Sequence, residues 1–190
     1  MKNIFLIALL TISLACFAQD KKQQTLSEVR EAYSSLLQKI KDRKEEPRVS
    51  DYAKFTVSEN WPGSGLREKT VEAWYSMDFD EEGDMGLKGH EVNFIRVKYN
   101  WAAVNYLEEY VISNQKVIFV FYKEYADSKS DETRIYNKNG ITILDKKKKD
   151  GATGEHPVNM QVIKADEDVG RLIQEGERRL LQIKNFLMNN

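Results

Sequence analysis

The segment Val117–Tyr122, with the sequence VIFVFY, is apolar at every position. Successive side chains of a β-strand point to opposite faces of a sheet, so this strand must be covered on both faces. Amphipathic helices supply one cover, and the other face needs a second layer. We expect that layer to come from the sheet itself, curled over, which predicts a strongly curved sheet or partial barrel.

Short β-branched and aromatic runs fill the chain from residue 49 to residue 163, with turn-forming residues between them. The connections are short, which favours an antiparallel meander over parallel β-α-β units that need a helix between strands. We expect strands at 52–58, 70–78, 91–100, 104–112, 116–125, 131–136 and 140–145, with a weaker one at 158–163.

An amphipathic helix is predicted on each side of the strand region. Thr25-Leu-Ser-Glu28 has the spacing of a capping box, and apolar residues then recur at three- and four-residue steps over 26–44. A second apolar stripe, preceded by acidic residues, predicts a helix over 167–188. Gly176 lies on that stripe, so we expect the sheet or the first helix to approach it closely.

The predicted fold class is therefore α+β. It consists of an N-terminal helix, a strongly curved antiparallel β-meander of seven to eight strands, and a C-terminal helix packed on the sheet. A chain of 190 residues forms one such domain once the N-terminal segment is set aside.

The first eighteen residues have the layout of a Sec signal peptide: Lys2, an apolar stretch Ile4–Leu14, and small residues. We expect cleavage after Ala18, export to the periplasm or the cell exterior, and a single domain over 19–190. A lipid anchor at Cys16 is the weaker alternative, because the preceding leucine lies one position too close to the cysteine. Cleavage removes the only cysteine, so we expect no disulfide.

Charge and hydropathy exclude two classes of function. The chain has 29 Lys and Arg against 30 Asp and Glu, so it lacks the excess positive charge of a nucleic-acid binder. After the signal peptide, no apolar run is long enough to cross a bilayer. We expect the partner to be a small molecule or an envelope protein, and the chain to be a monomer or homodimer.

Two neighbouring strands supply the main candidate site. If residues 101–103 connect them, residue numbers across the pair sum to 204, which places Arg96 opposite Glu108 on an aromatic face. The plainer alternative is an exposed ion pair that contributes under about 1 kcal/mol. Trp61, in a Pro/Gly loop, is the aromatic residue most suited to exposure for a purpose. The candidate ligand-binding residues are Trp61, Arg96, Trp101, Tyr106, Glu108 and Tyr110.

Signals for catalysis and for metals are weak. The loop carboxylates of Asp78, Asp80, Glu82 and Asp84 resemble the start of an EF-hand calcium loop. Gly89 stands where that loop needs a bidentate glutamate, so we expect a solvated acidic loop and no metal. Lys146–Lys149 is expected to form a solvated turn.

No nucleophile–base pair, metal set or cofactor fingerprint is visible in the sequence, so we expect no cofactor. The leading hypothesis is an exported, non-enzymatic ligand-binding module. The alternative is a protein–protein interaction module or a self-associating structural protein of the cell envelope. A hydrolase with no recognisable motif is the third hypothesis.

Overall fold

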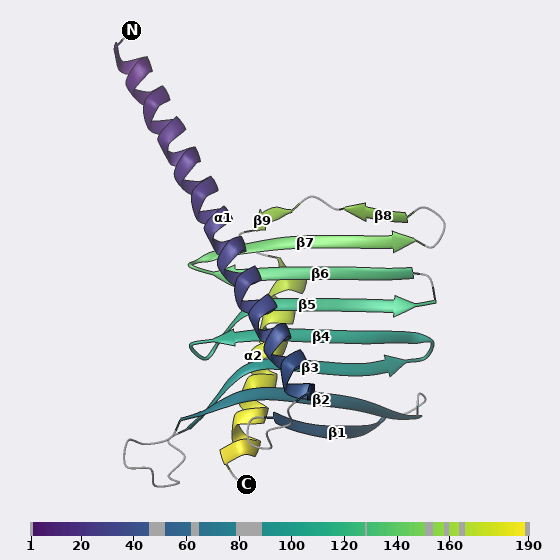
Figure 1. Ribbon diagram of the computed structural model, residues 1–190. Helices are drawn as coiled ribbons and strands as arrows, with labels where there is room; N and C mark the ends of the chain where they lie inside the picture. Colours follow the sequence, from purple (N-terminus) through teal and green to yellow (C-terminus); the bar gives the residue numbers. More distant parts are fainter. Residues whose placement is uncertain are drawn as a thin grey trace.

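The computed structural model describes residues 2–45, 52–61, 65–78, 89–127, 129–150, 154–157, 160–163 and 166–188. In chain order it contains a long helix, a meander of strands and a second helix, which confirms the predicted α+β class (Figure 1). The elements are α1 Lys2–Glu45, β1 Tyr52–Trp61, β2 Gly65–Asp78, β3 Gly89–Trp101, β4 Val104–Ser113, β5 Lys116–Ala126, β6 Lys129–Lys138, β7 Ile141–Asp150, β8 Gly154–Pro157, β9 Gln161–Ile163 and α2 Glu167–Met188.

The strands form one open antiparallel sheet in the order β1 to β8, so the predicted meander is confirmed and the sheet does not close into a barrel. β7 carries both β8 and β9 on its outer side, each paired over a few residues. β1 forms the opposite edge and pairs with β2 over its whole length.

Tight turns hold the meander in register. Asn114 and Gln115 connect β4 to β5 with φ values of 50° and 60°, and Asn139 and Gly140 connect β6 to β7 with 58° and 71°. Two successive residues with positive φ make the turn whose twist matches that of paired strands, and Asn and Gly tolerate this conformation best.

The expected register between β3 and β4 is wrong by one residue. The connection has two residues rather than three, Trp101 pairs with Val104, and Ala102 takes a φ of 53°. Arg96 therefore lies opposite Glu109, and paired residue numbers sum to 205. A slip of one residue moves every side chain of the partner strand to the other face.

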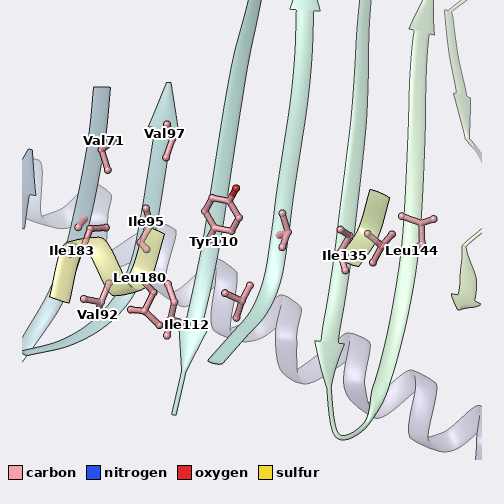
Figure 2. Packing of buried hydrophobic residues seen from close by; sticks show 14 residues of the cluster. Val71, Val92, Ile95, Val97, Tyr110, Ile112, Ile135, Leu144, Leu180 and Ile183 are labelled. Carbon is pink, nitrogen blue, oxygen red and sulfur yellow. The ribbon is translucent and has the colours of Figure 1, made fainter. Parts of the chain in front are cut away.

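The helices cover opposite faces of the sheet, and this corrects the expectation of a curled-over sheet layer. One apolar cluster joins α1 to one face, hereafter the α1 face, through Leu26 and Val29 against Phe94 and Phe119. The other joins α2 to the α2 face, in a cluster that contains Val169, Leu180 and Ile183 of the helix and side chains from β2 to β7. Figure 2 shows Leu180 and Ile183 beside Val92. The segment Val117–Phe121 is apolar throughout because it is buried between the two helices.

α1 begins earlier than the sequence predicts. Thr25 lies inside the helix rather than at its start. It is buried, and its hydroxyl has no hydrogen-bond partner in the part of the chain that the structure describes. The predicted capping box is therefore wrong. Lys22 reaches the Met160 carbonyl at 3.4 Å, and Glu28 forms an ion pair with Lys138 at 2.7 Å.

α2 approaches the sheet closely at Gly176, as the sequence predicted. A Cβ atom at this position would lie 2.5 Å from Cδ1 of Tyr110 and 3.1 Å from Cγ2 of Val117. The Tyr110 ring is fully buried and has no room to move away.

Replacing Gly176 by alanine should destabilise the fold by about 1–3 kcal/mol, because overpacking outweighs the roughly 1 kcal/mol gain in helix propensity. Urea unfolding followed by circular dichroism measures the change. Gly170→Ala in the same helix is the control, because a Cβ there meets nothing within 4 Å, and it should stabilise the protein slightly. Equal effects from the two variants would contradict close packing at Gly176.

Candidate functional site

Both helices cross the same half of the sheet and leave the other half uncovered (Figure 1). The covered half contains the turns after β4 and β6: Lys138 pairs with Glu28 of α1, and the Lys184 Nζ of α2 donates to Gln115 at 2.9 Å. The uncovered half contains the turns after β3 and β5. Side chains near those turns are therefore not covered by either helix, and among the aromatic ones on the α2 face Trp101 is exposed while Tyr99, Tyr106 and Tyr122 are partly exposed.

Four aromatic side chains occupy the uncovered half of the α2 face, and we name them the tyrosine patch: Tyr99, Trp101, Tyr106 and Tyr122. Tyr99 and Tyr106 lie opposite each other on β3 and β4, with rings stacked at a centroid distance of 4.8 Å. The Tyr122 ring follows on β5 at 6.4 Å from that of Tyr106. Trp101, beside the turn, is 51% exposed.

Two glutamates, buried Glu108 and half-buried Glu124, hold tyrosine hydroxyls in and next to the patch. Glu108 accepts a hydrogen bond from Tyr99 and another from Tyr110, both at 2.9 Å, and Glu124 accepts one from Tyr122 at 2.7 Å. Burial, and then the adjacent carboxylate, raise the pKa of Tyr99 and Tyr110 far above the ordinary value. These tyrosines therefore stay neutral donors at physiological pH.

Cations border the patch on the sheet. The Arg67 guanidinium lies 3.9 Å from the centroid of the Trp101 ring, and the Lys69 Nζ lies 5.5 Å from that of Tyr99. Both are within the distance at which an aromatic ring attracts a cation. They add positive charge along the edge of an otherwise neutral aromatic surface.

Arg179 of α2 has an incompletely satisfied buried donor. Its side chain is only 8% exposed and pairs with Glu175 at 2.8 Å, while its Nε finds no hydrogen-bond partner among the described residues. Hydrogen bonding from Arg178, and then the charge of Arg179, lower the pKa of Glu175. The positive charge of Arg179 also opposes the rise in the pKa of the buried Tyr110.

The α1 face carries a different polar group, built around Glu109. Arg96 donates from Nε to Glu109 at 2.7 Å, and Tyr33 of α1 donates its hydroxyl to the second carboxylate oxygen. The Arg96 guanidinium lies 5.4 Å from the ring centroids of both Trp74 and Phe94. This arrangement ties α1 to the sheet and leaves Glu109 buried.

The predicted one-face site containing both Arg96 and Glu108 is wrong, because these residues lie on opposite faces of the sheet. Trp101, Tyr106 and Glu108 share the α2 face, with Tyr110 fully buried behind them. The side chain of Trp61 lies outside the described residues. Ligand binding by these residues stays a prediction.

Sequence reasoning missed Tyr99, Tyr122 and Glu124 as members of the site. A signal was present, since Tyr99 with Trp101, Tyr106 with Glu108, and Tyr122 with Glu124 are each two residues apart. That spacing puts both members of each pair on one face of a strand.

The lysine run Lys146–Lys149 belongs to β7 and not to a turn, which corrects the expectation. Alternation sends its members to both faces. Lys147 and Lys148 lie opposite Glu132 and Asp131 of β6, so acidic residues face part of the run.

The candidate calcium ligands Asp80, Glu82 and Asp84 lie outside the described residues, and of Asp78 only the backbone is described, at the end of β2. Within the described part of the chain, no group of three or more His, Cys, Asp or Glu residues is arranged to hold a metal ion.

No family model matches the chain, and neither a curated protein nor a solved structure matches it. Among the helices in the described ranges, none combines the length and apolar character needed to cross a membrane.

Glu132 should contribute stability that depends on pH. Burial opposes its ionisation, but Lys123 at 2.9 Å and Arg134 at 2.6 Å together lower its pKa below 4.5. A carboxyl with a lowered folded pKa stabilises the fold above its unfolded pKa, and this contribution disappears as the pH falls through the folded value.

The wild type should therefore lose up to about 1 kcal/mol more stability between neutral and strongly acidic pH than Glu132→Gln does. Urea unfolding at a series of pH values measures the difference. Asp131→Asn is the matched control, because Asp131 is exposed in the same strand and makes no ion pair with a described residue. Parallel pH profiles for wild type and Glu132→Gln would refute the contribution.

Proposed function

We propose that the chain is an exported, non-enzymatic module that binds a saccharide across the tyrosine patch. The observation that carries the proposal is the position of the patch: four aromatic side chains on one face of the half-sheet that neither helix covers. Aromatic side chains with a polar tip offer a sugar both an apolar surface and hydrogen bonds.

The fixed positions of the patch side chains favour binding over catalysis. Glu108 accepts tyrosine hydroxyls with both of its carboxylate oxygens, so these oxygens are occupied in holding the rings. Side chains that are already fixed lose little conformational entropy when a ligand binds.

The position of α1 is compatible with export and cleavage after Ala18. Gln19 and Asp20 are exposed, and the first hydrogen bond from α1 to the sheet side of the fold is made by Lys22. Thr25 and Leu26 are the first buried residues of the described helix face. Removing the first eighteen residues therefore leaves these contacts in place.

The test uses residues 19–190 on an array of envelope oligosaccharides, followed by fluorescence titration of the oligosaccharide that binds. Trp101→Ala and Tyr106→Ala should each weaken binding by about tenfold, which corresponds to about 1.4 kcal/mol. Trp101 belongs to the patch and lies next to the turn between β3 and β4, so quenching of its fluorescence should accompany binding.

Tyr125→Ala is the matched control. Tyr125 is 40% exposed in the same uncovered half, but alternation along β5 places it on the α1 face, and its replacement should leave the affinity unchanged. The proposal fails if no oligosaccharide binds, or if the Tyr125 variant loses as much affinity as the Trp101 variant.

A further inference from the structure

Two polar atoms at the tyrosine patch are not used within the described fold. The hydroxyls of Tyr99 and Tyr122 donate to glutamates, but the Tyr106 hydroxyl makes no hydrogen bond with the part of the chain that the structure describes. Glu124 accepts the Tyr122 hydroxyl with Oε1, and its Oε2 has no partner among the same residues. Neither the Tyr106 hydroxyl nor Oε2 of Glu124 is a buried atom, so both reach solvent.

The residues that carry these two atoms are neighbours across two strands. Tyr106 of β4 lies directly opposite Glu124 of β5, on the α2 face. Side chains in such positions have Cβ atoms about 4.5–5.5 Å apart. Both residues lie near the start of β4 and the end of β5, in the half of the sheet that neither helix covers (Figure 1). A hydroxyl and a carboxylate oxygen are therefore available side by side.

Ring packing restrains the Tyr106 hydroxyl. The Tyr106 ring is stacked on that of Tyr99, with an angle of 6° between the ring planes. From the strand on the other side, the Tyr122 ring lies 6.4 Å away and is tilted by 45°. Rings from both neighbouring strands thus hold the Tyr106 side chain, so its hydroxyl loses little conformational entropy when it binds a ligand.

The chemistry of the two groups fits a pair of sugar hydroxyls. A tyrosine hydroxyl donates and accepts hydrogen bonds, whereas a carboxylate oxygen only accepts them. One sugar hydroxyl can donate to Glu124 while the neighbouring sugar hydroxyl accepts from Tyr106. Hydrogen bonds to an ionised acceptor are roughly twice as strong as neutral ones, so a sugar oxygen without its hydrogen would bind poorly at Glu124.

The charges around Glu124 disfavour an acidic sugar. Asp131 of β6 lies opposite Glu124 and is exposed, so it adds a second negative charge on the same face, with Lys148 of β7 opposite it. The two cations that border the patch belong to β2, with β3 and β4 between them and Glu124. A sugar carboxylate at Glu124 would therefore meet a like charge.

We propose that Tyr106 and Glu124 bind two adjacent hydroxyl groups of a neutral sugar, so that the ligand of the patch is a neutral oligosaccharide rather than an acidic one. Glu124 supplies the discrimination against acidic sugars, and Tyr106 supplies the second hydrogen bond. This inference rests on the proposed function, since it names the class of saccharide bound at the same surface.

Matched pairs of oligosaccharides test the class of ligand. In each pair the linkage and length are the same, and one member consists of neutral hexoses while the other consists of the corresponding uronic acids, as in fragments of mannan and mannuronan. Fluorescence titration of residues 19–190 should show about tenfold tighter binding of a neutral member than of its acidic counterpart. Methylation of the adjacent hydroxyls in the neutral member should weaken its binding by about tenfold.

Two conservative variants test the residues. Tyr106→Phe keeps the ring stack and removes only the hydroxyl, so it should weaken binding by about fivefold and leave the urea midpoint unchanged. Glu124→Gln keeps an acceptor for Tyr122 but removes the charge, so it should reduce the preference for the neutral member by about tenfold. Tyr125→Phe and Glu132→Gln make the same changes on the α1 face and should alter neither the affinity nor the preference.

The proposal fails if the acidic member of a pair binds as tightly as the neutral one. It also fails if either Tyr106→Phe or Glu124→Gln binds like the wild type while Tyr106→Ala is weakened. In that case the patch binds saccharides through its rings, and the proposed function stands without this inference. If no oligosaccharide binds, the proposed function and this inference are both rejected.

Discussion

Two buried carboxylates on adjacent residues, Glu108 and Glu109, are the constraint on which the rest of the structure depends. They belong to a strand covered by α2 on one face and by α1 on the other, and each is satisfied on its own side. Glu108 receives two tyrosine hydroxyls, whereas Glu109 receives Arg96 and Tyr33. A slip of β4 by one residue would move each carboxylate to the other face and would separate Glu108 from the two tyrosine hydroxyls. The hydrogen bonds of the pair therefore stabilise the observed register.

The same pair also fixes the start of the tyrosine patch. Glu108 lies at the point where the cover of α2 ends, so one of its tyrosines, Tyr110, is buried under the helix beside Gly176, and the other, Tyr99, belongs to the open patch. The hydrogen bonds that stabilise the core thus also fix the ring that begins the patch. Because the Tyr106 ring stacks on the Tyr99 ring, the fixed position of Tyr99 also restrains Tyr106 in the uncovered half of the sheet.

Most elements of this fold could be predicted from the sequence, because hydrophobic periodicity marks them clearly. The bounds of α2 agree with the expected 167–188, and the meander follows from short connections. The register of β3 and β4 could not be predicted for two physical reasons. First, Ala102 has a positive φ, which an alanine in a sequence does not predict. Second, the adjacent residues Glu108 and Glu109 offer Arg96 an opposite charge in either register. Nor does periodicity tell which face of a sheet a helix covers, so the two-sided helix cover was missed.

The two faces of the uncovered half carry different kinds of side chain. On the α1 face, Lys123 and Arg134 pair with Glu132, and such partly exposed ion pairs keep a sheet surface hydrated without a covering layer. On the α2 face, β3 and β4 hold stacked tyrosines and an exposed tryptophan. Hydration alone would be served equally well by charged residues on both faces. The aromatic side chains therefore call for a different explanation, and contact with a ligand on the α2 face supplies one that agrees with their fixed hydroxyls.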